Sequence, residues 1–457
     1  MRKVCSSSWA TQAARISQRH CVQYVMDTRA SDDVASVMRS DYGRAVTPPA
    51  ALPPTVTDAL ASLVPWPDDG TRPDGPVAVD ATDRLLLTES ALLVAGAGPR
   101  GVVVLGDRFG ALTLGVLALG AETVRAHHDT IDSEAATLHN ATRAQEALDL
   151  PDAPSRIATS DELGPELLDG ARLVLLQLPK SLGELTEITE AVARYAADDV
   201  TVLAGGRLKH MTRSMNDVLA DRFTEVRATL ARSKSRALVA TGVRPEARTA
   251  TPLYPARARL TDPELLAAAT PTHDDATAPE HVDVVAHGGT FAGTGLDHGT
   301  RFLLSTAGRW PSAARVQDAV DLGCGTGLLA VVLGRRYPDS RVAATDRSAA
   351  AVASARATLA ANGVEGSVSR GDVGSDLPDS SADLVLLNPP FHDRAAVSTD
   401  AAHRMFATAR RSLRPGGELW CVFNTKLRYR GSLARAVGPT EHVAQDPRFT
   451  VTRSRKP

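Results

Sequence analysis

The segment Asp321-Leu-Gly-Cys-Gly-Thr-Gly327 has the residue types of a turn that binds a nucleotide-like cofactor. Glycines adopt positive φ and let a ligand approach the backbone closely, and the amino terminus of a following helix favours an anionic group. The acidic residue precedes the glycines and no Walker lysine follows them, which separates this pattern from a phosphate-binding P-loop. A tight turn without a ligand is the alternative. The candidate cofactor-binding residues of this segment are Asp321, Gly323, Cys324, Gly325, Thr326 and Gly327, with Cys324 as a small packing residue.

Two acidic residues further along could bind other parts of the same cofactor. Asp346 ends the strand-like stretch 341–345, where a carboxylate can accept both hydroxyl hydrogens of a ribose. Helix capping is the alternative role for Asp346. Asp372 follows the strand-like stretch 366–370 and is placed to meet the amino group of an adenine, with Asp376 as its competitor.

The tetrapeptide Asn388-Pro-Pro-Phe391 has the residue types for binding a planar amino group. Proline has no N–H, so Asn388 Oδ1 and the Pro389 carbonyl present two acceptors while Pro390 adds no donor. Phe391 offers a ring face on which a base or an amide can stack. We therefore predict Asn388, Pro389, Pro390 and Phe391 as the catalytic residues and Asn388 also as a cofactor-binding residue, with a structural turn as the alternative. His392 is either a general base or a structural hydrogen-bonding residue.

These residues follow strand-like stretches that alternate with helix-like ones, which indicates an α/β fold. The first half of the chain has a similar series, in which Gly106-Asp-Arg-Phe-Gly110 follows one apolar stretch and Gln177 follows another. Gln177 lies 71 residues after Gly106, and Asn388 lies 65 residues after Gly323, which indicates an internal duplication. Arg108 replaces the middle glycine in the first copy, and Gln-Leu-Pro-Lys replaces Asn-Pro-Pro-Phe. We therefore expect the first copy to have lost the chemistry.

The domain organisation follows from these patterns. Residues 1–45 are polar and lack periodicity, so they are predicted to be a disordered extension. Residues 46–243 and 281–457 each have α/β patterning and form the two predicted domains. Residues 244–280 contain six prolines and are predicted to be a linker with at most one short helix.

Composition excludes several protein classes. The chain has 457 residues, 43% hydrophobic and 23% charged, which is long enough for at least two cores. No apolar stretch reaches the roughly 18 residues of a membrane-spanning helix, and the start lacks a signal-peptide pattern. We therefore expect a cytoplasmic protein without a membrane partner. Four cysteines lie far apart, which fits neither a disulfide framework nor a zinc site, so no metal is expected.

Charge is distributed unevenly along the chain. The net charge is -2, yet residues 401–457 carry 12 Lys+Arg against 3 Asp+Glu. Such a basic segment favours contacts with nucleic-acid phosphates, and a solvated helix face with a charged tail is the alternative. A second candidate RNA surface in the first domain consists of Arg207, Lys209, His210 and Arg213, which could equally be an ordinary loop.

Taken together, the residues resemble a known enzyme family. The glycine turn, Asp346, Asp372 and the Asn-Pro-Pro-Phe string are similar to those of class I S-adenosylmethionine-dependent N-methyltransferases. Further residues resemble those of the ribosomal RNA guanine-N2 methyltransferases. These residues are the segment 291–304, which contains Asp297 and Thr300, the segment 206–210, and His392, Asn424 and Tyr429. The residues Thr425-Lys-Leu-Arg428 between Asn424 and Tyr429 are more polar than is usual in that family.

The resemblance implies two tandem Rossmann-like class I methyltransferase domains, of which the N-terminal one is degenerate and RNA-binding or structural. It also implies S-adenosylmethionine as methyl donor and ribosomal RNA or a ribosomal subunit as partner, with Asp297 and Thr300 closing over the methionine end of the cofactor. The implied reaction methylates the N2 amine of a guanine. This amine is a poor nucleophile, so positioning does most of the work. The alternatives are a protein-glutamine or adenine N-methyltransferase and a noncatalytic RNA-binding ribosome-assembly factor.

Overall fold

The computed structural model describes residues 51–67, 75–147, 152–272, 277–390 and 395–457, so the extension predicted over 1–45 lies outside the described residues. The chain divides into units 1–47 and 48–457, and the description below concerns the second unit. No helix of the described residues is long and apolar enough to cross a lipid bilayer.

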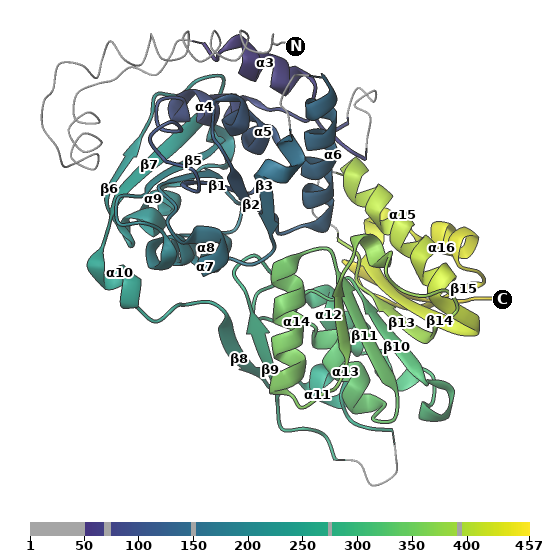
Figure 1. Cartoon of the computed structure of the whole chain (residues 1–457). Helices are drawn as coiled ribbons and strands as arrows, with labels where there is room; N and C mark the ends of the chain where they lie inside the picture. Colours follow the sequence, from purple (N-terminus) through teal and green to yellow (C-terminus); the bar gives the residue numbers. More distant parts are fainter. Residues whose placement is uncertain (1–50, 68–74, 148–151, 273–276, 391–394) are drawn as a thin grey trace, which may run out of the picture. The chain divides into compact units, whose positions relative to one another are not determined.

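A seven-stranded sheet with the strand order β3-β2-β1-β4-β5-β7-β6 organises the first half of this unit (Figure 1). Strands β1 to β5 are parallel, and β7 runs antiparallel to both β5 and β6. The strands are β1 (Val102–Leu105), β2 (Val124–His127), β3 (Ile157–Ser160), β4 (Leu173–Gln177), β5 (Thr201–Arg207), β6 (Phe223–Ala228) and β7 (Ser235–Val243). The helices are α3 (Pro54–Ala61), α4 (Ala81–Ser90), α5 (Ala111–Ala118), α6 (Ile131–Ala147), η1 (Ala153–Arg156), α7 (Pro165–Leu168), α8 (Leu182–Tyr195), η2 (Leu208–His210) and α9 (Arg213–Ala220).

The second half repeats this topology strand for strand, with the order β12-β11-β10-β13-β14-β16-β15. Its strands are β10 (Asp318–Leu322), β11 (Arg341–Asp346), β12 (Ser367–Arg370), β13 (Ala382–Leu387), β14 (Leu413–Asn424), β15 (Thr440–Gln445) and β16 (Phe449–Arg455). Its helices are α12 (His298–Leu304), η3 (Ala307–Arg309), η4 (Ala313–Arg315), α13 (Leu328–Arg336), α14 (Ala349–Ala361), η5 (Asp372–Gly374), α15 (Ala395–Ser412), η6 (Thr425–Leu427) and α16 (Arg430–Ala436). Two sheets of one topology confirm the prediction of two tandem Rossmann-like domains.

The segment between the two sheets has more regular structure than the sequence suggested. It contains α10 (Pro245–Thr249), β8 (Ala256–Leu260) and α11 (Pro263–Ala268), where one short helix was expected. Strand β8 pairs antiparallel with β9 (Val282–Ala286), and β9 in turn contacts α14. The segment is therefore partly built into the second domain.

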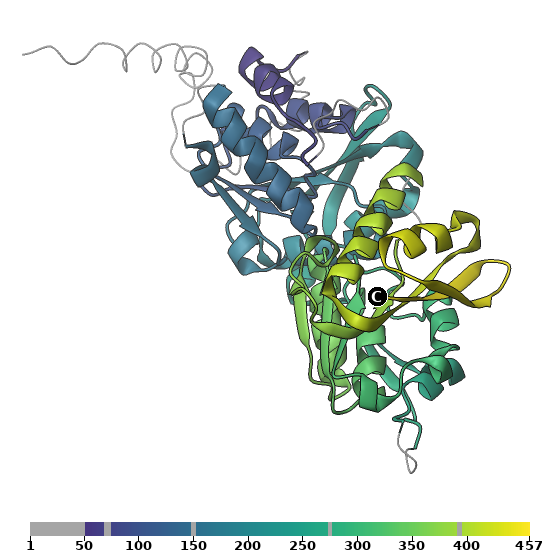
Figure 2. The ribbon, with the colours of Figure 1, turned by 90° about the vertical axis from the view of Figure 1, so that its right-hand side faces the viewer.

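Each of the two seven-stranded sheets is covered by helices on both faces (Figures 1 and 2). In the second domain, Leu384 and Leu386 of β13 pack in one apolar cluster with residues of α11 to α14. Val385 and Leu387 alternate with them and pack in the opposite cluster with residues of α15 and α16. Buried apolar residues on both faces are typical of a central parallel strand, and this arrangement holds the carboxyl ends of β10 and β13 rigidly at one sheet edge.

Candidate active site

The glycine turn joins β10 to α13 as the sequence predicts. Gly323, Gly325 and Gly327 have φ of 79°, 52° and 76°, a region in which other residues are strained. A Cβ at Gly327 would lie 2.8 Å from the backbone of Ala355 in α14, so the third glycine is required for close helix packing. At Gly325, by contrast, no described atom lies within 4 Å of such a Cβ. The turn is thus tightly packed on its helix side and open at its centre.

Two buried carboxylates hold this turn in place. Asp346, at the end of β11, accepts hydrogen bonds from the backbone N–H of Gly325 and of Ser348, both at 3.0 Å. Asp321, at 1% exposure, accepts from the N–H of Ala330 in α13, and burial raises its pKa to about 7. Burial also raises the pKa of Asp346, as expected for a carboxylate removed from water.

Asn388 lies directly after β13 and is held by two residues of α12. Its Nδ2 donates to Asp297 Oδ2 at 3.0 Å and to Thr300 Oγ1 at 2.9 Å. Asp297 is also the N-cap of α12 and accepts from the Thr300 N–H at 3.0 Å. A carboxylate at its ordinary charge only accepts, so the amide nitrogen of Asn388 must face Asp297, which fixes the orientation of the amide group.

The oxygen of the same amide is the unusual atom of the site. Asn388 Oδ1 is buried and has no hydrogen-bond partner within the described part of the chain. A buried acceptor without a partner is costly, so such an atom points to a ligand that donates to it.

A small cavity of about 60 Å³ joins these elements. Asp297, Thr300 and Asn388 line it together with the glycine turn. Burial raises the pKa of the Cys324 thiol, so this lining residue stays protonated and packs as a small apolar group. Of the predicted cofactor-binding residues, the lining includes Asp297, Thr300, Gly323, Cys324, Gly325, Thr326 and Asn388, while Asp321, Gly327 and Asp346 support it from behind.

The remaining predicted residues lie elsewhere. Asp372 makes a two-pronged ion pair with Arg404 of α15, at 2.6 and 3.1 Å, and does not line the cavity. Its competitor Asp376 accepts hydrogen bonds from Thr345 Oγ1 and Ser369 Oγ. Either carboxylate would need to exchange a protein partner to meet an adenine.

The end of the tetrapeptide is only partly described. Pro389 is buried and Pro390 is exposed, whereas Phe391 and His392 lie outside the described residues. Further along, Asn424 caps η6 by accepting from the Lys426 N–H at 3.0 Å.

The glycine turn of the first domain occupies the equivalent position but is filled by its own side chains. Leu105 pairs with Leu176 in the register in which Leu322 pairs with Leu387. Asp107, at 2% exposure, accepts from the N–H of Gly110 at 3.0 Å and from both the N–H and the hydroxyl of Thr113 at 2.8 Å. The equivalent N–H groups of the second domain, those of Gly327 and Ala330, are also satisfied within the chain, by the Cys324 carbonyl and by Asp321, so the two turns differ in which group accepts.

Two further positions of the first domain carry a different residue from the second domain, and each bonds within the first domain. The residue equivalent to Asp346 is His128, which is buried and whose Nδ1 lies 3.2 Å from the Asp107 carbonyl. The equivalent of Asn388 is Gln177, whose Nε2 donates to buried Asp83 of α4 at 2.5 Å. Asp83 therefore holds an amide in the first domain much as Asp297 does in the second.

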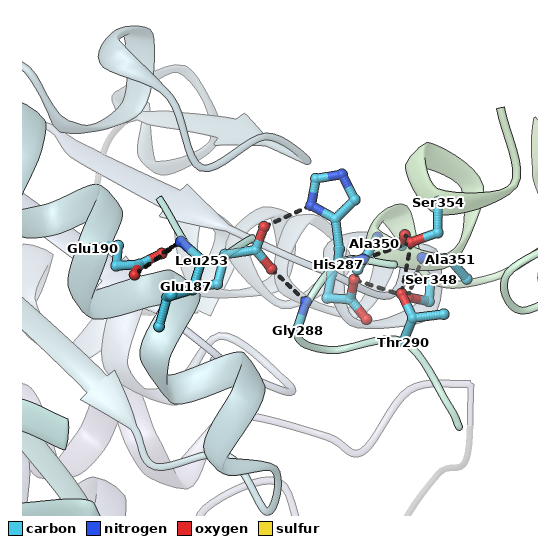
Figure 3. Close-up of polar contacts among 11 residues, drawn as sticks. Glu187, Glu190, Leu253, His287, Gly288, Thr290, Ser348, Ala350, Ala351 and Ser354 are labelled. Atoms are coloured by element: carbon cyan, nitrogen blue, oxygen red, sulfur yellow. Dashed lines mark hydrogen bonds and ion pairs between the residues drawn. The ribbon is translucent and has the colours of Figure 1, made fainter. Parts of the chain in front are cut away.

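Contacts between the domains involve residues that the sequence did not single out. Glu187 of α8 bonds His287 Nδ1 at 2.6 Å and the Gly288 N–H at 2.8 Å (Figure 3). Asp129, after β2, accepts from Ser348 Oγ at 2.9 Å and from the Ala350 N–H at 3.0 Å. These contacts join residues 100 or more positions apart, so no local pattern could reveal them.

Arg370 is the third such residue, at the end of β12. Its guanidinium donates to Glu134 of α6 at 2.9 Å and to the carbonyl of His128. Its side chain is only 13% exposed, so this is a largely buried interdomain ion pair. Arg370, which pairs with Asp346 in the sheet, and Ser348, two residues after Asp346, both bond residues of the first domain. The neighbourhood of Asp346 is thus attached to the first domain at two points.

Comparisons with known proteins agree with this geometry. The family model "Methyltransferase small domain" matches residues 281–453, and "RLMG N-terminal domain" matches residues 62–244. The boundaries predicted for the two domains and for the linker between them stay predictions. "Ribosomal RNA large subunit methyltransferase G" of Streptomyces avermitilis is 36% identical over 401 residues, covering 87% of this chain and 97% of the relative. The protein of that name in Pseudomonas entomophila is 34% identical, covering 83% and 94%.

A solved structure shows the same fold across both domains. The T. thermophilus 16S rRNA N2 methyltransferase, solved with AdoMet and guanosine, superposes with a TM-score of 0.62 and 19% sequence identity, covering 88% of this chain and 99% of that chain. Its likeness concerns the fold, whereas the curated relatives are similar enough in sequence over most of their length to show descent. The chain therefore belongs to the ribosomal RNA large subunit methyltransferase G family.

Proposed function

We propose that the second domain transfers a methyl group from S-adenosylmethionine to the exocyclic N2 amine of a guanine in ribosomal RNA. The observation that carries this proposal is the unpartnered, buried Oδ1 of Asn388, whose orientation Asp297 and Thr300 fix from the other side of the amide. An oriented acceptor at a cofactor cavity suits an amine that must be held while it reacts.

S-adenosylmethionine fits the residues that are present. The cofactor could approach the backbone closely at Gly325, where a Cβ would meet open space, and at the cavity lined by the glycine turn. Asp346, which holds the Gly325 N–H, is the residue that we assign to the ribose diol. Asp297 and Thr300 stand at the end of the cavity beside Asn388, where the methionine part belongs by resemblance. When bound, this cofactor supplies an electrophilic methyl group on a sulfonium.

The chain's own residues would then orient the amine. Asn388 Oδ1 and the Pro389 carbonyl each accept one N–H of the guanine amino group, and Phe391 stacks on the base. Holding both hydrogens aims the nitrogen lone pair and favours its rehybridisation toward the transition state. The methylated amine loses a proton readily, so water suffices as the base.

The RNA class follows from the family and from charge. The curated relatives are named for the RNA of the large ribosomal subunit, and the C-terminal segment 401–457 carries 12 Lys+Arg against 3 Asp+Glu. The same Asn388 oxygen could also hold the amine of an adenine or of a glutamine side chain. A protein without transfer activity that binds RNA during ribosome assembly is the noncatalytic alternative.

One experiment separates these possibilities. The full-length protein is incubated with labelled S-adenosylmethionine and with ribosomal RNA or subunits that lack the modification, and the labelled nucleosides are identified. N2-methylguanosine in the wild-type reaction, and none with Asn388→Ala, is the expected result. Labelled N6-methyladenosine or labelled protein would replace the guanine assignment. Cofactor binding without any transfer would leave the assembly-factor alternative.

A further inference from the structure

A second and larger cavity lies beside α12, and nothing described so far uses it. Its volume is about 370 Å³, within the range of small-molecule binding sites. We call it the α12 cavity. It is lined by Glu264, His298, Arg301, Phe302, Ser305, Asp446, Arg448 and Phe449.

The α12 cavity and the cofactor cavity lie on different faces of one short helix. His298, Arg301, Phe302 and Ser305 recur at helical spacing and line the α12 cavity, whereas Asp297 and Thr300 line the cofactor cavity. A base bound in the α12 cavity is therefore separated from the methyl donor by the helix backbone.

Gly299 of α12 lies close to a lining residue of each cavity. A Cβ built on Gly299 would lie 3.4 Å from Asn388 Oδ1 and 3.3 Å from Phe449 Cε1. The Phe449 ring edge and the unpartnered acceptor are thus both near this one glycine. The α12 cavity is an immediate neighbour of the atom proposed to hold the reacting amine.

The charges of the cavity do not suit a bare phosphate. Arg301 is paired with Asp262 at 2.8 Å and with Glu264 at 2.7 Å. Asp446 Oδ1 accepts from the N–H groups of Arg448 and Phe449, both at 2.6 Å. The lining therefore offers carboxylates as well as cations, and an anion alone would meet repulsion.

Two cationic or titratable side chains at the cavity remain uncommitted. Within the described ranges, neither the imidazole of His298 nor the guanidinium of Arg448 makes a hydrogen bond or an ion pair. Both side chains are exposed, and they flank the half-buried rings of Phe302 and Phe449. Donors, acceptors and ring faces at one place are the features with which proteins bind single unstacked bases of RNA.

We propose that the α12 cavity binds the base of a nucleotide next to the methylated guanine, so that the enzyme holds two adjacent nucleotides on either side of α12. The proposal rests on the proposed function, because it takes Asn388 as the place of the target amine. Arg448 and His298 hold the neighbouring nucleotide, and Phe449 supports its base.

The test uses the full-length double variant His298→Ala/Arg448→Ala. We expect its KM for RNA to rise at least about tenfold, the typical effect of losing contacts to one base, while kcat and the S-adenosylmethionine affinity stay within about twofold. Arg315→Ala is the matched control, because Arg315 is exposed in η4 near the amino end of β10, at the other end of the strands. An unchanged KM in the double variant would overturn the proposal.

RNA substrates supply the second arm. Replacing the base on the 5′ or the 3′ side of the mapped guanine by an abasic residue should raise the wild-type KM at one of these positions by a similar factor. On that abasic substrate the KM of the double variant should equal that of the wild type, since the contact to the missing base is already absent. Additive losses would show that the side chains act elsewhere on the RNA.

A binding measurement separates failure of this proposal from failure of the proposed function. The affinity of wild type and double variant for unmodified ribosomal RNA is measured without any transfer step. If the wild type methylates no guanine yet the double variant binds RNA at least about tenfold more weakly, the cavity binds RNA and only the reaction is wrong. Equal affinities would overturn the α12 cavity as an RNA site.

Discussion

The two domains have one topology, but different acceptors hold the backbone N–H groups of their glycine turns. In the second domain, the N–H of Gly325 is held by Asp346 from a neighbouring strand, and the centre of the turn stays open. In the first domain, Asp107 lies inside the turn and satisfies its N–H groups directly. The comparison teaches that equivalent N–H groups can be satisfied by different acceptors without a change of fold: by Asp321 and the Cys324 carbonyl in the second domain, and by Asp107 in the first.

The ends of the fourth strands show a subtler difference. A carboxylate of the preceding helix segment holds an amide in both domains, Asp297 with Asn388 and Asp83 with Gln177. Among the described residues, the Asn388 oxygen is a buried atom without a hydrogen-bond partner, whereas the Gln177 oxygen is not such an atom. We therefore take this one uncommitted oxygen, besides the differences in residue type, as the feature that would let the second copy hold a substrate amine.

The strongest way to break this comparison is Asn388→Ala. We expect methyl transfer to fall by at least about 1000-fold, since an acceptor made for the reacting amine is lost, while cofactor affinity stays nearly intact. Labelled methyl transfer and titration calorimetry measure the two quantities. Gln177→Ala, the same truncation in the first domain, should leave transfer within about twofold. Parallel loss of cofactor affinity and activity in Asn388→Ala would contradict the proposed role.

The next test gives the second turn the residue that stands at the equivalent position of the first, where Arg108 is exposed. Gly325→Arg should weaken S-adenosylmethionine binding at least about 100-fold, because a long side chain enters the open centre of the turn. The fold should survive, since no described atom lies within 4 Å of the new Cβ and the left-handed backbone costs only about 1–2 kcal/mol. Calorimetry and thermal unfolding measure both effects.

The reverse change sharpens the same point. Arg108→Gly should not create a cofactor site, because the equivalents of Asp346 and Asn388 in the first domain are His128 and Gln177, whose side chains are engaged within that domain. Calorimetry on the full chain that found a second equivalent of bound cofactor in this variant would show that the side chain of Arg108 alone had closed the site.

A smaller effect is expected at the ribose position. Asp346→Ala removes the carboxylate that holds Gly325 and is proposed to hold a ribose, and the loss of charged hydrogen bonds should weaken cofactor binding by about tenfold or somewhat more. Calorimetry on the folded variant measures this. An unchanged dissociation constant would remove Asp346 from the cofactor site and leave it as a support of the turn.

The smallest effect concerns pH. Burial, with the charges of Asp107 and Asp80, raises the pKa of Asp83 to about 8 from 3.8. The folded state therefore binds more protons than the unfolded state between these values, and the free energy of unfolding falls as pH rises through that window. Asp83→Asn cannot ionise, so its unfolding should depend less on pH. Urea unfolding at about pH 5 and about pH 8 measures the difference, with exposed Asp58→Asn as the control that keeps the slope.

The sequence was enough to predict those features that depend on residues close together in the chain. The glycine turn, the strand ends at Asp346 and Asn388 and the duplication each depend on short strings with a fixed spacing, and the two sheets confirm the fold that they predict. Partners chosen by tertiary packing could not be read in this way. Arg404 reaches Asp372 from a helix 32 residues further on, and nothing near Asp372 signals it.

One difference between the two turns is visible in the sequence. The acidic Asp107 stands where the second turn has Cys324, and such a side chain can accept from backbone N–H groups at the start of the following helix, as it does from that of Thr113. The unpartnered oxygen of Asn388 could not have been found, because it depends on two residues of α12 that lie about 90 positions away.

The contact of Asp129 with Ser348 links the first domain thermodynamically to the glycine turn of the second. Asp129 binds Ser348, the Ser348 N–H binds Asp346, and Asp346 binds Gly325, so three hydrogen bonds run in series from the first domain to the centre of the glycine turn. A ligand that tightens this turn must by linkage also stabilise the docked state of the first domain. The first domain would then behave as a reporter of cofactor occupancy, with an unfolding temperature that rises with the concentration of a molecule it does not itself bind.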